Sequence, residues 1–504
     1  MSADADRYPC LNPRNYHEGV APATRHASRQ FMPFRMFQVA AAMVPAKTAL
    51  VTEDGSLTFA ELDELTRRMA SGLMALGVQR GEAVSVLMGN RWEQFALWLA
   101  VARMGAVFMA ASRYMTRTEI LFQLDELRPR LVIGDYGVKL DDILAAATGD
   151  PVEPFNNELA GFAIRFSSGT TGRPKMMIAS HRTQSWIYPM YASEQGLSDS
   201  DVHFCVGPLA HAALHYAMAA LFVGATVVMK EKFDKETLWN DCARHKITNT
   251  MLVPTMITSA LDYPGEAPEL RTVTSVGAPL TPALKTKFLH RFPRIGLFDM
   301  YGASEFGTVT CLRPHEQMLR PTSAGRACVG SEIQIFDDEG KPVPVGEIGS
   351  IYCRGPSIVD GVIGSVKPPA LPAHLVADGW WSCGDLGKLD ADGYLYFSDR
   401  RVDLILSGGL NVYPAEVEAA LVEVPGIRNA VVVGLPDEKW GQRVTAYVEG
   451  QAAQEDLQAV LKEKLAPYKH PRAVHYVPEL PRTSTGKLSR KLVRDAIAAG
   501  QMPS

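Results

Sequence analysis

Short apolar segments alternate with longer amphipathic segments along much of this chain. After Thr58, a residue type that often begins helices, leucine and methionine recur at three- and four-residue steps, which predicts a helix over 59–76. An apolar strand at 83–88, a helix at 92–104 and a second apolar run at 106–111 follow. This order is typical of a parallel β-sheet whose faces are covered by helices.

The alternation returns in the middle of the chain and gives way to other patterns toward the C-terminus. Between 332 and 353, turn residues separate short alternating strands, which predicts an antiparallel subdomain. A compact α+β unit is expected beyond Asp403, so the main domain boundary is predicted near residue 400. The expected helices are 182–194, 212–222, 234–245, 414–423 and 454–465, and the expected strands are 202–206, 225–229, 250–253, 428–434 and 443–449.

Composition excludes several function classes. The 504 residues are 47% hydrophobic and 21% charged with a formal charge of -4, so no basic field for binding nucleic acid is expected. Seven cysteines without a C-x-x-C pair argue against a disulfide framework or a zinc site. We therefore expect a site for small molecules.

The sequence predicts neither a secretory signal nor a transmembrane span. Residues 1–30 are polar and contain no apolar segment of the kind a signal peptide needs. The longest apolar stretches, 95–111 and 212–229, are interrupted by Arg103 and by His215, which favours core elements over membrane spans. A cytoplasmic protein is expected.

Residues 167–175 read Ser-Ser-Gly-Thr-Thr-Gly-Arg-Pro-Lys and follow an apolar segment. The glycines let the backbone approach phosphate oxygens closely, while the hydroxyls and the lysine supply donors and charge. The glycine spacing and Pro174 differ from a Walker A loop. A solvated polar turn is the alternative. The predicted phosphate-binding residues are Ser167, Ser168, Gly169, Thr170, Thr171, Gly172 and Lys175.

This loop closely resembles the phosphate loop of the adenylate-forming superfamily, which includes acyl- and aryl-CoA synthetases, firefly luciferase and peptide-synthetase adenylation domains. Further motifs follow in that family's order over roughly residues 45–495, closest to the fatty-acyl or aryl-CoA ligases. The resemblance implies an α/β and α+β protein with a large domain of parallel α/β subdomains, a small antiparallel β subdomain and a small mobile C-terminal lid. The expected divisions are a polar arm at 1–30, the large domain at 31–399 with its β-rich part at about 320–399, a hinge at 400–403 and the lid at 404–504.

Two motifs of the large domain resemble the family's nucleotide site. By this resemblance Tyr301 packs on adenine, Asp299 meets the adenine amino group, and Ser304, where threonine is usual, offers its hydroxyl to the α-phosphate. Glu305 is the expected ligand of Mg²⁺, a cation that takes hard oxygen ligands. The matching residues are Gly277, Ala278, Pro279, Asp299, Met300, Tyr301, Gly302, Ser304 and Glu305.

Three further resemblances concern the ribose, the catalytic lysine and the hinge. Asp385 matches the aspartate that accepts both ribose hydroxyls, and Arg400 matches an arginine that also reaches the ribose. Cys383, two positions before Asp385, stands where the family usually has threonine. Lys487 matches the family's C-terminal catalytic lysine, a cation that meets charge developing at the α-phosphate. Val402 stands at the hinge position where aspartate or lysine is usual, and its β-branched side chain predicts a stiffer or displaced pivot.

The binding sites for the acceptor and for the acid are predicted from different segments of the sequence. The glycine loop resembles the one that borders the pantetheine tunnel of CoA ligases, and an aromatic and basic group suits the CoA nucleotide, although Trp440 fits the core of the lid equally well. The expected CoA residues are Ser407, Gly408, Gly409, Trp440, Tyr468, His470 and Arg472. Because the segments 203–216, 275–280 and 299–307 contain no lysine or arginine, an apolar monocarboxylate, fatty or aromatic, is favoured. The candidate wall residues are Trp186, His211, Ala212, Ala278 and Met300, with His211 also placed between nucleotide and acyl group by the resemblance.

The implied reaction has two halves: the acid attacks Mg-ATP to give acyl-AMP and pyrophosphate, and the thiol of coenzyme A then displaces AMP. Alternatives within the superfamily use a carrier-protein thiol or an oxygen or amine acceptor. A non-catalytic ATP-binding homologue is disfavoured because Glu305 and Lys487 are both present. The expected partners are a small carboxylic acid, ATP and CoA, with a homodimer as an option. The Pro-rich stretch 359–373 departs from the family pattern, and no function is assigned to it.

Overall fold

The computed structural model describes residues 31–111, 115, 117–149, 152, 154–166, 175–365, 371–407, 410–437, 439–483 and 487–503. The chain divides into two compact units. The first unit comprises Met1–Pro321, Gly325–Glu332 and Cys353–Trp381, and the second comprises Thr322–Ala324, Ile333–Tyr352 and Ser382–Ser504.

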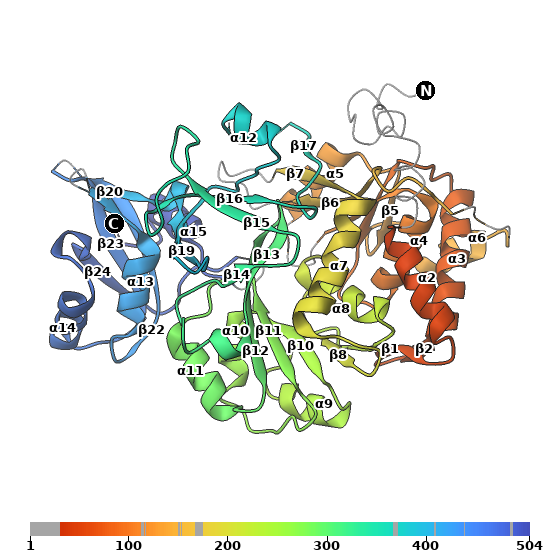
Figure 1. The fold of residues 1–504 in the computed structure, drawn as a ribbon, viewed down its shortest axis with the longest axis horizontal. Coiled ribbons are helices and arrows are strands. Elements are labelled where there is room, and N and C mark those ends of the chain that lie inside the picture. Colours follow the sequence, from red (N-terminus) through yellow and green to blue (C-terminus); the bar gives the residue numbers. More distant parts are fainter. Residues whose placement is uncertain are drawn as a thin grey trace. The chain divides into compact units, whose positions relative to one another are not determined.

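The first unit contains a six-stranded sheet that is parallel on one side and antiparallel on the other (Figure 1). The strands lie in the order β17 (Gly361–Ile363), β7 (Met176–Ser180), β6 (Gly161–Phe166), β4 (Val107–Ala110), β3 (Ala83–Leu87) and β5 (Leu131–Gly134). Strands β6, β4, β3 and β5 run parallel, whereas β7 is antiparallel to both β6 and β17. The chain between Phe166 and Lys175 therefore connects two antiparallel strands, and residues 167–174 themselves lie outside the described residues.

A nine-stranded sheet forms the other half of the first unit. Its strands lie in the order β14 (Arg326–Ala327), β13 (Gly307–Leu312), β12 (Gly296–Ala303), β11 (Thr272–Val276), β10 (Asn249–Leu252), β8 (Val202–Cys205), β9 (Thr226–Met229), β1 (Thr48–Thr52) and β2 (Gly55–Thr58). The strands from β12 to β1 in this order run parallel, and antiparallel strands close both edges. The predicted parallel α/β organisation is confirmed, with antiparallel edges that the alternation pattern alone did not indicate.

Helices cover both faces of these sheets and fill the space between them. Helices α7 and α8 pack on each other, α7 against β6 and β7 and α8 against β8 and β9, so they lie between the two sheets (Figure 1). The helices are α2 (Pro33–Met43), α3 (Phe59–Ala75), α4 (Glu93–Met104), α5 (Arg117–Leu127), α6 (Leu140–Ala146), α7 (His181–Gln195), α8 (Ala212–Phe222), α9 (Leu238–Arg244), α10 (Pro254–Ala260), α11 (Pro282–Arg291), the short η3 (Pro314–Glu316) and α12 (Ala373–Ala377).

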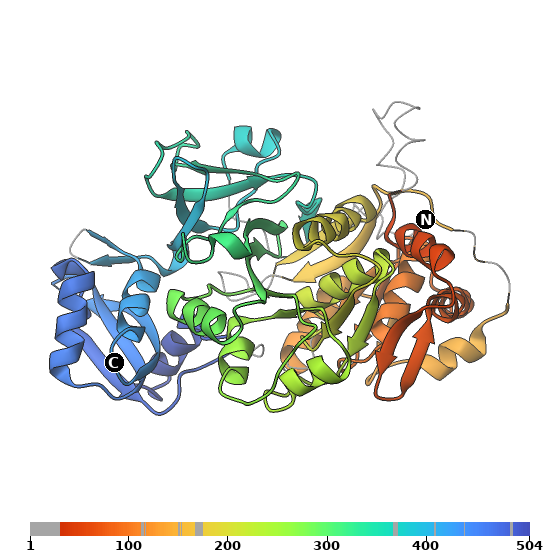
Figure 2. The same cartoon turned by 60° about the horizontal axis from the view of Figure 1, so that its bottom comes forward.

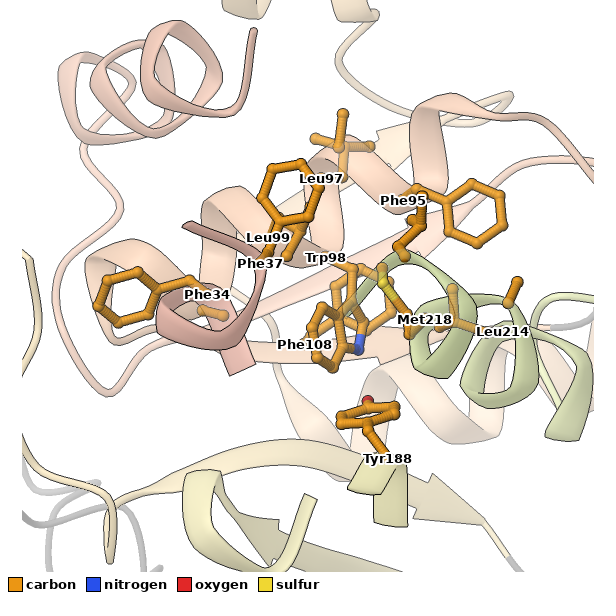
Figure 3. Packing of buried hydrophobic residues seen from close by; sticks show 14 of the residues in the cluster. Phe34, Phe37, Phe95, Leu97, Trp98, Leu99, Phe108, Tyr188, Leu214 and Met218 are labelled. Atoms are coloured by element: carbon orange, nitrogen blue, oxygen red, sulfur yellow. The ribbon is translucent and has the colours of Figure 1, made fainter. Parts of the chain in front are cut away.

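The main core of the first unit is built around Trp98 of α4 (Figure 3). The indole is fully buried, and its ring centroid lies 4.7 Å from that of Phe162 and 5.9 Å from that of Tyr188, both in edge-on contact. Such aromatic pairs add to the free energy gained by burying apolar area. Because Phe162 belongs to β6 and Tyr188 to α7, this cluster holds α7 in place over the strand that leads into the 167–174 segment.

Local signals explain where two of the predicted helices begin. The predicted helix at 59–76 is confirmed as α3, whose N-terminus is closed by a reciprocal capping box between Thr58 and Glu61. The helix predicted over 234–245 is shorter and begins at Leu238. The prediction was wrong for its first turn because the side chain of Asp234 accepts a hydrogen bond from the backbone N–H of Glu236, which favours a turn over a helix there.

The second unit contains a four-stranded sheet and a five-stranded sheet. The four-stranded sheet has the order β15 (Glu332–Phe336), β16 (Gly349–Arg354), β18 (Asp385–Leu389) and β19 (Leu395–Arg400), with antiparallel pairing of β16, β18 and β19. The short η4 (Arg401–Asp403) follows β19. The five-stranded sheet is formed by β20 (Ile405–Ser407), β21 (Leu410–Val412), β22 (Ile427–Asp437), β23 (Gly441–Gly450) and β24 (Ala473–Val477).

Helices sandwich the five-stranded sheet. Helices α13 (Pro414–Val422) and α14 (Gln454–Lys464) share one apolar cluster with one face of the sheet. Helix α15 (Arg490–Ala498) packs on the other face, against alternate strand residues such as Val431 and Tyr447. The short η5 (Pro467–Lys469) precedes β24. The long strands β22 and β23 run side by side through the blue part of the chain (Figures 1 and 2). Among the described residues, no helix combines the length and apolar character needed to cross a bilayer.

Candidate active site

The structure brings together Lys175 and Glu305, two residues that the sequence assigned to phosphate and to Mg²⁺. Lys175 immediately precedes β7, and Glu305 follows β12. The Lys175 Nζ lies 3.2 Å from the Glu305 Oε1, and the two side chains are only 7% and 6% exposed. A buried charge needs a partner of opposite sign because the protein interior solvates it poorly, so each residue satisfies the other.

Two predicted nucleotide segments lie at the carboxyl ends of adjacent parallel strands. Val276, the last residue of β11, pairs with Met300 of β12, so Gly277-Ala278-Pro279 emerges beside Met300 and Tyr301. Ligands of α/β proteins bind at such strand ends. Gly277 has a φ of +93°, which only glycine adopts without strain. A Cβ at Gly302 would lie 2.1 Å from the carbonyl oxygen of Gly307, so no side chain fits there.

Asp299 has a buried partner that the sequence reasoning missed. The Nζ of Lys285, on α11, lies 3.0 Å from the Asp299 Oδ2, and the lysine side chain is 1% exposed. Burial raises the pKa of Asp299, while the charge of Lys285 acts in the opposite direction. The signal available in the sequence was a lysine three residues before Phe288, on the face of α11 that packs into the core. If Asp299 meets the adenine amino group as predicted, it does so while paired with Lys285.

The loop that carries His211 is held by Asn90, another residue that the sequence reasoning missed. The Asn90 Nδ2 donates to the carbonyl of Gly207 at 2.9 Å, and its Oδ1 accepts from the N–H of Leu209 at 2.7 Å. His211 is the N-cap residue of α8 and is exposed. The Asn90 amide thus orders the segment that leads into this helix, in a region where the sequence offered only a polar residue in a turn.

The predicted acyl-pocket residues lie on different elements of the first unit. The hydroxyl of Tyr216 on α8 donates to the Met300 Sδ at 3.1 Å, which connects α8 to the end of β12. Ala212 is the first residue of α8. Trp186 packs near Phe31, with ring centroids 6.1 Å apart, and next to Gly330. Ala278 follows β11, beside Met300.

The second unit brings the predicted ribose residues and the predicted catalytic lysine together. Asp385 and Arg400 are cross-strand partners on β18 and β19, and the Arg400 Nε lies 3.6 Å from the Asp385 Oδ1. Burial lowers the pKa of Lys487, and the nearby charge of Arg400 lowers it further. Three groups that the motifs assigned to the nucleotide thus converge although 102 positions separate Asp385 from Lys487 in the numbering of the chain.

The CoA residues divide into two small groups on the second unit. The Arg472 guanidinium stacks on the Trp440 ring at 4.2 Å from its centroid, and Lys439 lies 5.0 Å from the same centroid. The ammonium of Lys469 lies 5.7 Å from the Tyr468 ring centroid. Ser407 ends β20 and is buried, and His470 forms a hydrogen bond to the carbonyl oxygen of Leu465 at 3.0 Å. Gly408, Gly409 and residues 484–486 lie outside the described residues.

Arg490, which the sequence reasoning missed, connects both sides of the predicted hinge. Its guanidinium pairs with Asp399, which precedes residues 400–403, and with Asp403 at 3.2 Å and Glu418 at 2.5 Å. Val402 lies in the single turn of η4 and is 53% exposed. No local pattern indicates this network, because its members lie on β19, η4, α13 and α15, which come together only in the folded chain.

Comparisons with known proteins agree with these motifs. A family model described as AMP-binding enzyme matches residues 37–362, and one described as AMP-binding enzyme C-terminal domain matches residues 416–487. The 2-succinylbenzoate–CoA ligase of Listeria monocytogenes is 30% identical over 466 residues, which covers 90% of this chain and 97% of the relative. The indoleacetate–CoA ligase of Aromatoleum aromaticum is 32% identical over 498 residues, which covers 91% of this chain and 96% of the relative.

Solved structures with a similar fold belong to the same group of enzymes. The o-succinylbenzoate CoA synthetase (MenE) of Bacillus subtilis, solved with its acyl-adenylate intermediate OSB-AMP, matches with a TM-score of 0.84 and 29% identity over 92% of this chain and 98% of that one. The same synthetase has been solved with ATP and a magnesium ion. A family match over more than half of the chain, together with relatives of this coverage, shows that the chain belongs to the AMP-binding enzymes, the adenylate-forming family that its motifs resemble.

Proposed function

We propose that this chain is an AMP-forming ligase that joins an aromatic carboxylic acid to coenzyme A. The observation that carries the proposal is the convergence of Asp385, Arg400 and Lys487 in the second unit, together with the Lys175–Glu305 pair in the first. The sequence left fatty and aromatic acids open. Both curated relatives are ligases of aromatic acids, which supports the aromatic class, whereas an assignment to fatty acid metabolism is not supported.

In the first half-reaction, a carboxylate oxygen forms a bond to the α-phosphorus of ATP as the bond to the bridging oxygen breaks and pyrophosphate leaves. Lys487 supplies a positive charge for the phosphoryl group as its negative charge rearranges, and Asp385 with Arg400 orients the ribose. Lys175 binds phosphate oxygens, and Glu305 holds Mg²⁺, which neutralises phosphate charge when bound. The paired carboxylate and ammonium fit this assignment because they present one ligand for a hard cation and one for an anion.

In the second half-reaction, the thiol sulfur attacks the acyl carbon, the carbon–oxygen bond to AMP breaks and AMP leaves with the electron pair, while the thiol proton passes to solvent. The acyl phosphate has a far better leaving group than the free acid, so one difficult step becomes two easier ones. The Trp440–Arg472 stack supports CoA as the acceptor because it presents an aromatic and basic surface suited to a nucleotide phosphate.

The direct test incubates the purified chain with ATP, Mg²⁺, CoA and a panel of aromatic and fatty acids, and identifies the thioester and AMP by mass spectrometry. We expect acid-dependent thioester and AMP in equal amounts, with aromatic acids preferred. Lys491→Ala serves as a matched control for Lys487→Ala because Lys491 is exposed and pairs with Asp495 on the same helix. AMP formation without thioester would identify another acceptor, and no AMP with any acid would indicate a nucleotide-binding protein without turnover.

A further inference from the structure

Arg165, on β6, is a largely enclosed cation with no carboxylate at close range in the described part of the chain. Its Nη2 donates to the Gln184 Oε1 at 2.8 Å and its Nη1 to the carbonyl oxygen of Ser304 at 3.4 Å. Its Nε is buried and has no acceptor on any residue that the structure describes. Among the described residues Arg165 has no ion-pair partner. Asp360 and Glu305, whose charges act on it, are engaged elsewhere: Asp360 accepts from Ser180 and Thr183, and Glu305 pairs with Lys175.

The network around Gln184 defines the tautomer of His215. Because Arg165 can only donate, the Gln184 amide must present its oxygen to it and its nitrogen to the other side. That nitrogen donates to the Tyr188 hydroxyl at 2.8 Å and to the His215 Nδ1 at 3.1 Å. Burial lowers the pKa of His215 to about 3, with the charges of Arg165 and His211 adding to the effect. A neutral His215 that accepts at Nδ1 carries its proton on Nε2, so it is a second donor.

These two donors lie beside the predicted acyl pocket. His215 stands one helical turn after His211 on α8, and its neighbour Tyr216 contacts the predicted wall residue Met300. Arg165 reaches the carbonyl of Ser304, the residue whose hydroxyl the motif assigns to the α-phosphate. Arg165 and His215 are both partly accessible, although Gln184 and Tyr188 between them are fully buried. Arg165 lies on β6, outside the segments 203–216, 275–280 and 299–307 on which the prediction of an apolar acid depends.

We propose that Arg165 and His215 bind a second carboxylate on the aromatic acid, distinct from the one that is adenylated. The inference rests on the proposed function and names the substrate class more closely. A guanidinium with unused N–H groups binds a carboxylate strongly in a low-dielectric site, and the His215 Nε2–H supplies a further donor to the same group. An apolar substituent in this place would leave the remaining N–H groups of Arg165 and the His215 Nε2–H without acceptors and the buried charge without a counter-ion, which is costly.

The test uses acids that differ only in a second carboxylate. One pair is 3-benzoylpropanoate and 2-succinylbenzoate, and the other is phenylacetate and 2-carboxyphenylacetate. For the wild-type chain we expect kcat/KM for acid-dependent AMP release to be ~10²-fold higher for the diacid of at least one pair, the size typical of a buried charge-assisted contact. In Arg165→Met this preference is expected to fall to within a few-fold of unity, because the second carboxylate loses its partner while the two acids of a pair share every other contact.

Two further variants separate binding from folding. Arg165→Lys keeps the charge and loses the fork of donors, so a reduced but measurable diacid preference is expected. Arg68→Met removes an exposed arginine of α3 and is expected to leave the preference unchanged. Because Arg165 has no carboxylate partner within the described ranges, Arg165→Met is expected to keep or raise the thermal midpoint of unfolding. If Arg165→Met unfolds, the wild-type preference and Arg165→Lys still decide the question.

The possible outcomes are distinct. A wild-type chain that activates monoacids as well as or better than their diacid partners overturns the inference and leaves the proposed function intact. Equal loss for both members of a pair in Arg165→Met would also overturn it, because it would assign Arg165 to the reacting carboxylate or the phosphate. Absence of AMP release with every acid, including the wider panel, would contradict the proposed function and the inference with it.

Discussion

The Lys175 Nζ and the Glu305 Oε1 lie 3.2 Å apart in a nearly inaccessible ion pair. The two residues are 130 positions apart, one immediately before β7 and the other shortly after β12, so the fold of the first unit alone creates the contact. If Lys175 binds phosphate and Glu305 binds Mg²⁺, Mg-ATP must take the place of this direct contact. The ion pair is then a resting form, in which each residue gives up the other as its partner when Mg-ATP binds.

Glu305→Gln tests this relationship through the metal. The amide keeps the shape of the side chain and removes its charge, so the Mg²⁺ concentration for half-maximal adenylation is expected to rise by ~10-fold or more, because a neutral oxygen is a weaker ligand for a hard cation. The measurement is a Mg²⁺ titration of acid-dependent AMP release. Glu339→Gln, at an exposed position, is the matched control. An unchanged titration would remove Glu305 from the metal site.

Lys487→Ala is expected to abolish adenylation and spare thioester formation from supplied acyl-AMP. In the proposed mechanism the ammonium meets charge that develops on the phosphoryl group only in the first half-reaction. Loss of one such preorganised charge typically lowers the rate ~10²-fold or more. Both half-reactions are measured separately in single-turnover experiments, with Lys491→Ala as control. A similar loss in the two half-reactions would mean that Lys487 serves the fold or the nucleotide site in general.

Asp399→Asn tests whether Arg490 stabilises one arrangement of the predicted hinge. Arg490 joins Asp399, before residues 400–403, to Asp403 and Glu418 after them, in the same arrangement that brings Lys487 close to Arg400. Rotation within the hinge must change one side of this network. Weakening the Asp399 side is therefore expected to slow adenylation several-fold more than thioester formation.

The control for the hinge is Val402→Pro, which restrains φ near -65° and removes one N–H. If Val402 is the pivot, this variant keeps one half-reaction near the wild-type rate and loses most of the other. Equal rates in both half-reactions for Val402→Pro and Asp399→Asn would show that the chain does not turn at this segment. If Arg401→Pro or Asp403→Pro instead affects one half-reaction far more than the other, the pivot lies at that neighbouring residue.

The stability of the fold is expected to fall below pH 6.5 through buried neutral histidines. Burial lowers the pKa of His181 from 6.5 to about 3, and neither ring nitrogen has a hydrogen-bond partner among the described residues. Between these values the unfolded chain binds a proton that the folded chain does not, so the free energy of unfolding falls by about 1.4 kcal/mol per pH unit for this group as the pH decreases. His203 and His215 act in the same direction.

His181→Phe is the test of that slope. The imidazole stacks on Phe162 with ring centroids 4.6 Å apart, so phenylalanine retains the ring contact and cannot be protonated. Urea unfolding at pH 7 and at pH 5 should show a smaller loss of stability for the variant than for the wild type. His290→Phe, on an exposed part of α11, is expected to keep the wild-type slope. Equal slopes for His181→Phe and the wild type would show that His181 is protonated in the folded chain.

Elements with strong local signals were predictable from the sequence. Helix α3 follows from its periodic leucines and the Thr58–Glu61 capping box, both of which are local in the chain. The antiparallel pairing of β6 with β7 was not predictable, because an apolar segment carries no signal for its partner or direction. Contacts between distant elements were missed for the same reason: Lys285 with Asp299, Asn90 with the 207–209 segment, and Arg165 with Ser304.

The site shows the same division between local and distant information. The motifs name Lys487 and Glu305 as members of a family pattern, and their roles in this chain stay predictions until the half-reactions are measured. The prediction of an apolar acid depended on the absence of lysine and arginine from three segments. A pocket, however, is lined by every element that the fold places around it. One arginine from a strand outside those segments changes the charge of its wall.

The exchange of labelled pyrophosphate into ATP, in the presence of Mg²⁺ and an aromatic acid and without CoA, tests the central claim most directly. Formation of acyl-AMP is reversible before the thiol acts, so the account predicts label in ATP that depends on the acid and is lost in Lys487→Ala. Exchange that is independent of the acid, or its absence with every acid of the panel while ATP still binds, would contradict the proposal that this chain activates carboxylic acids as adenylates.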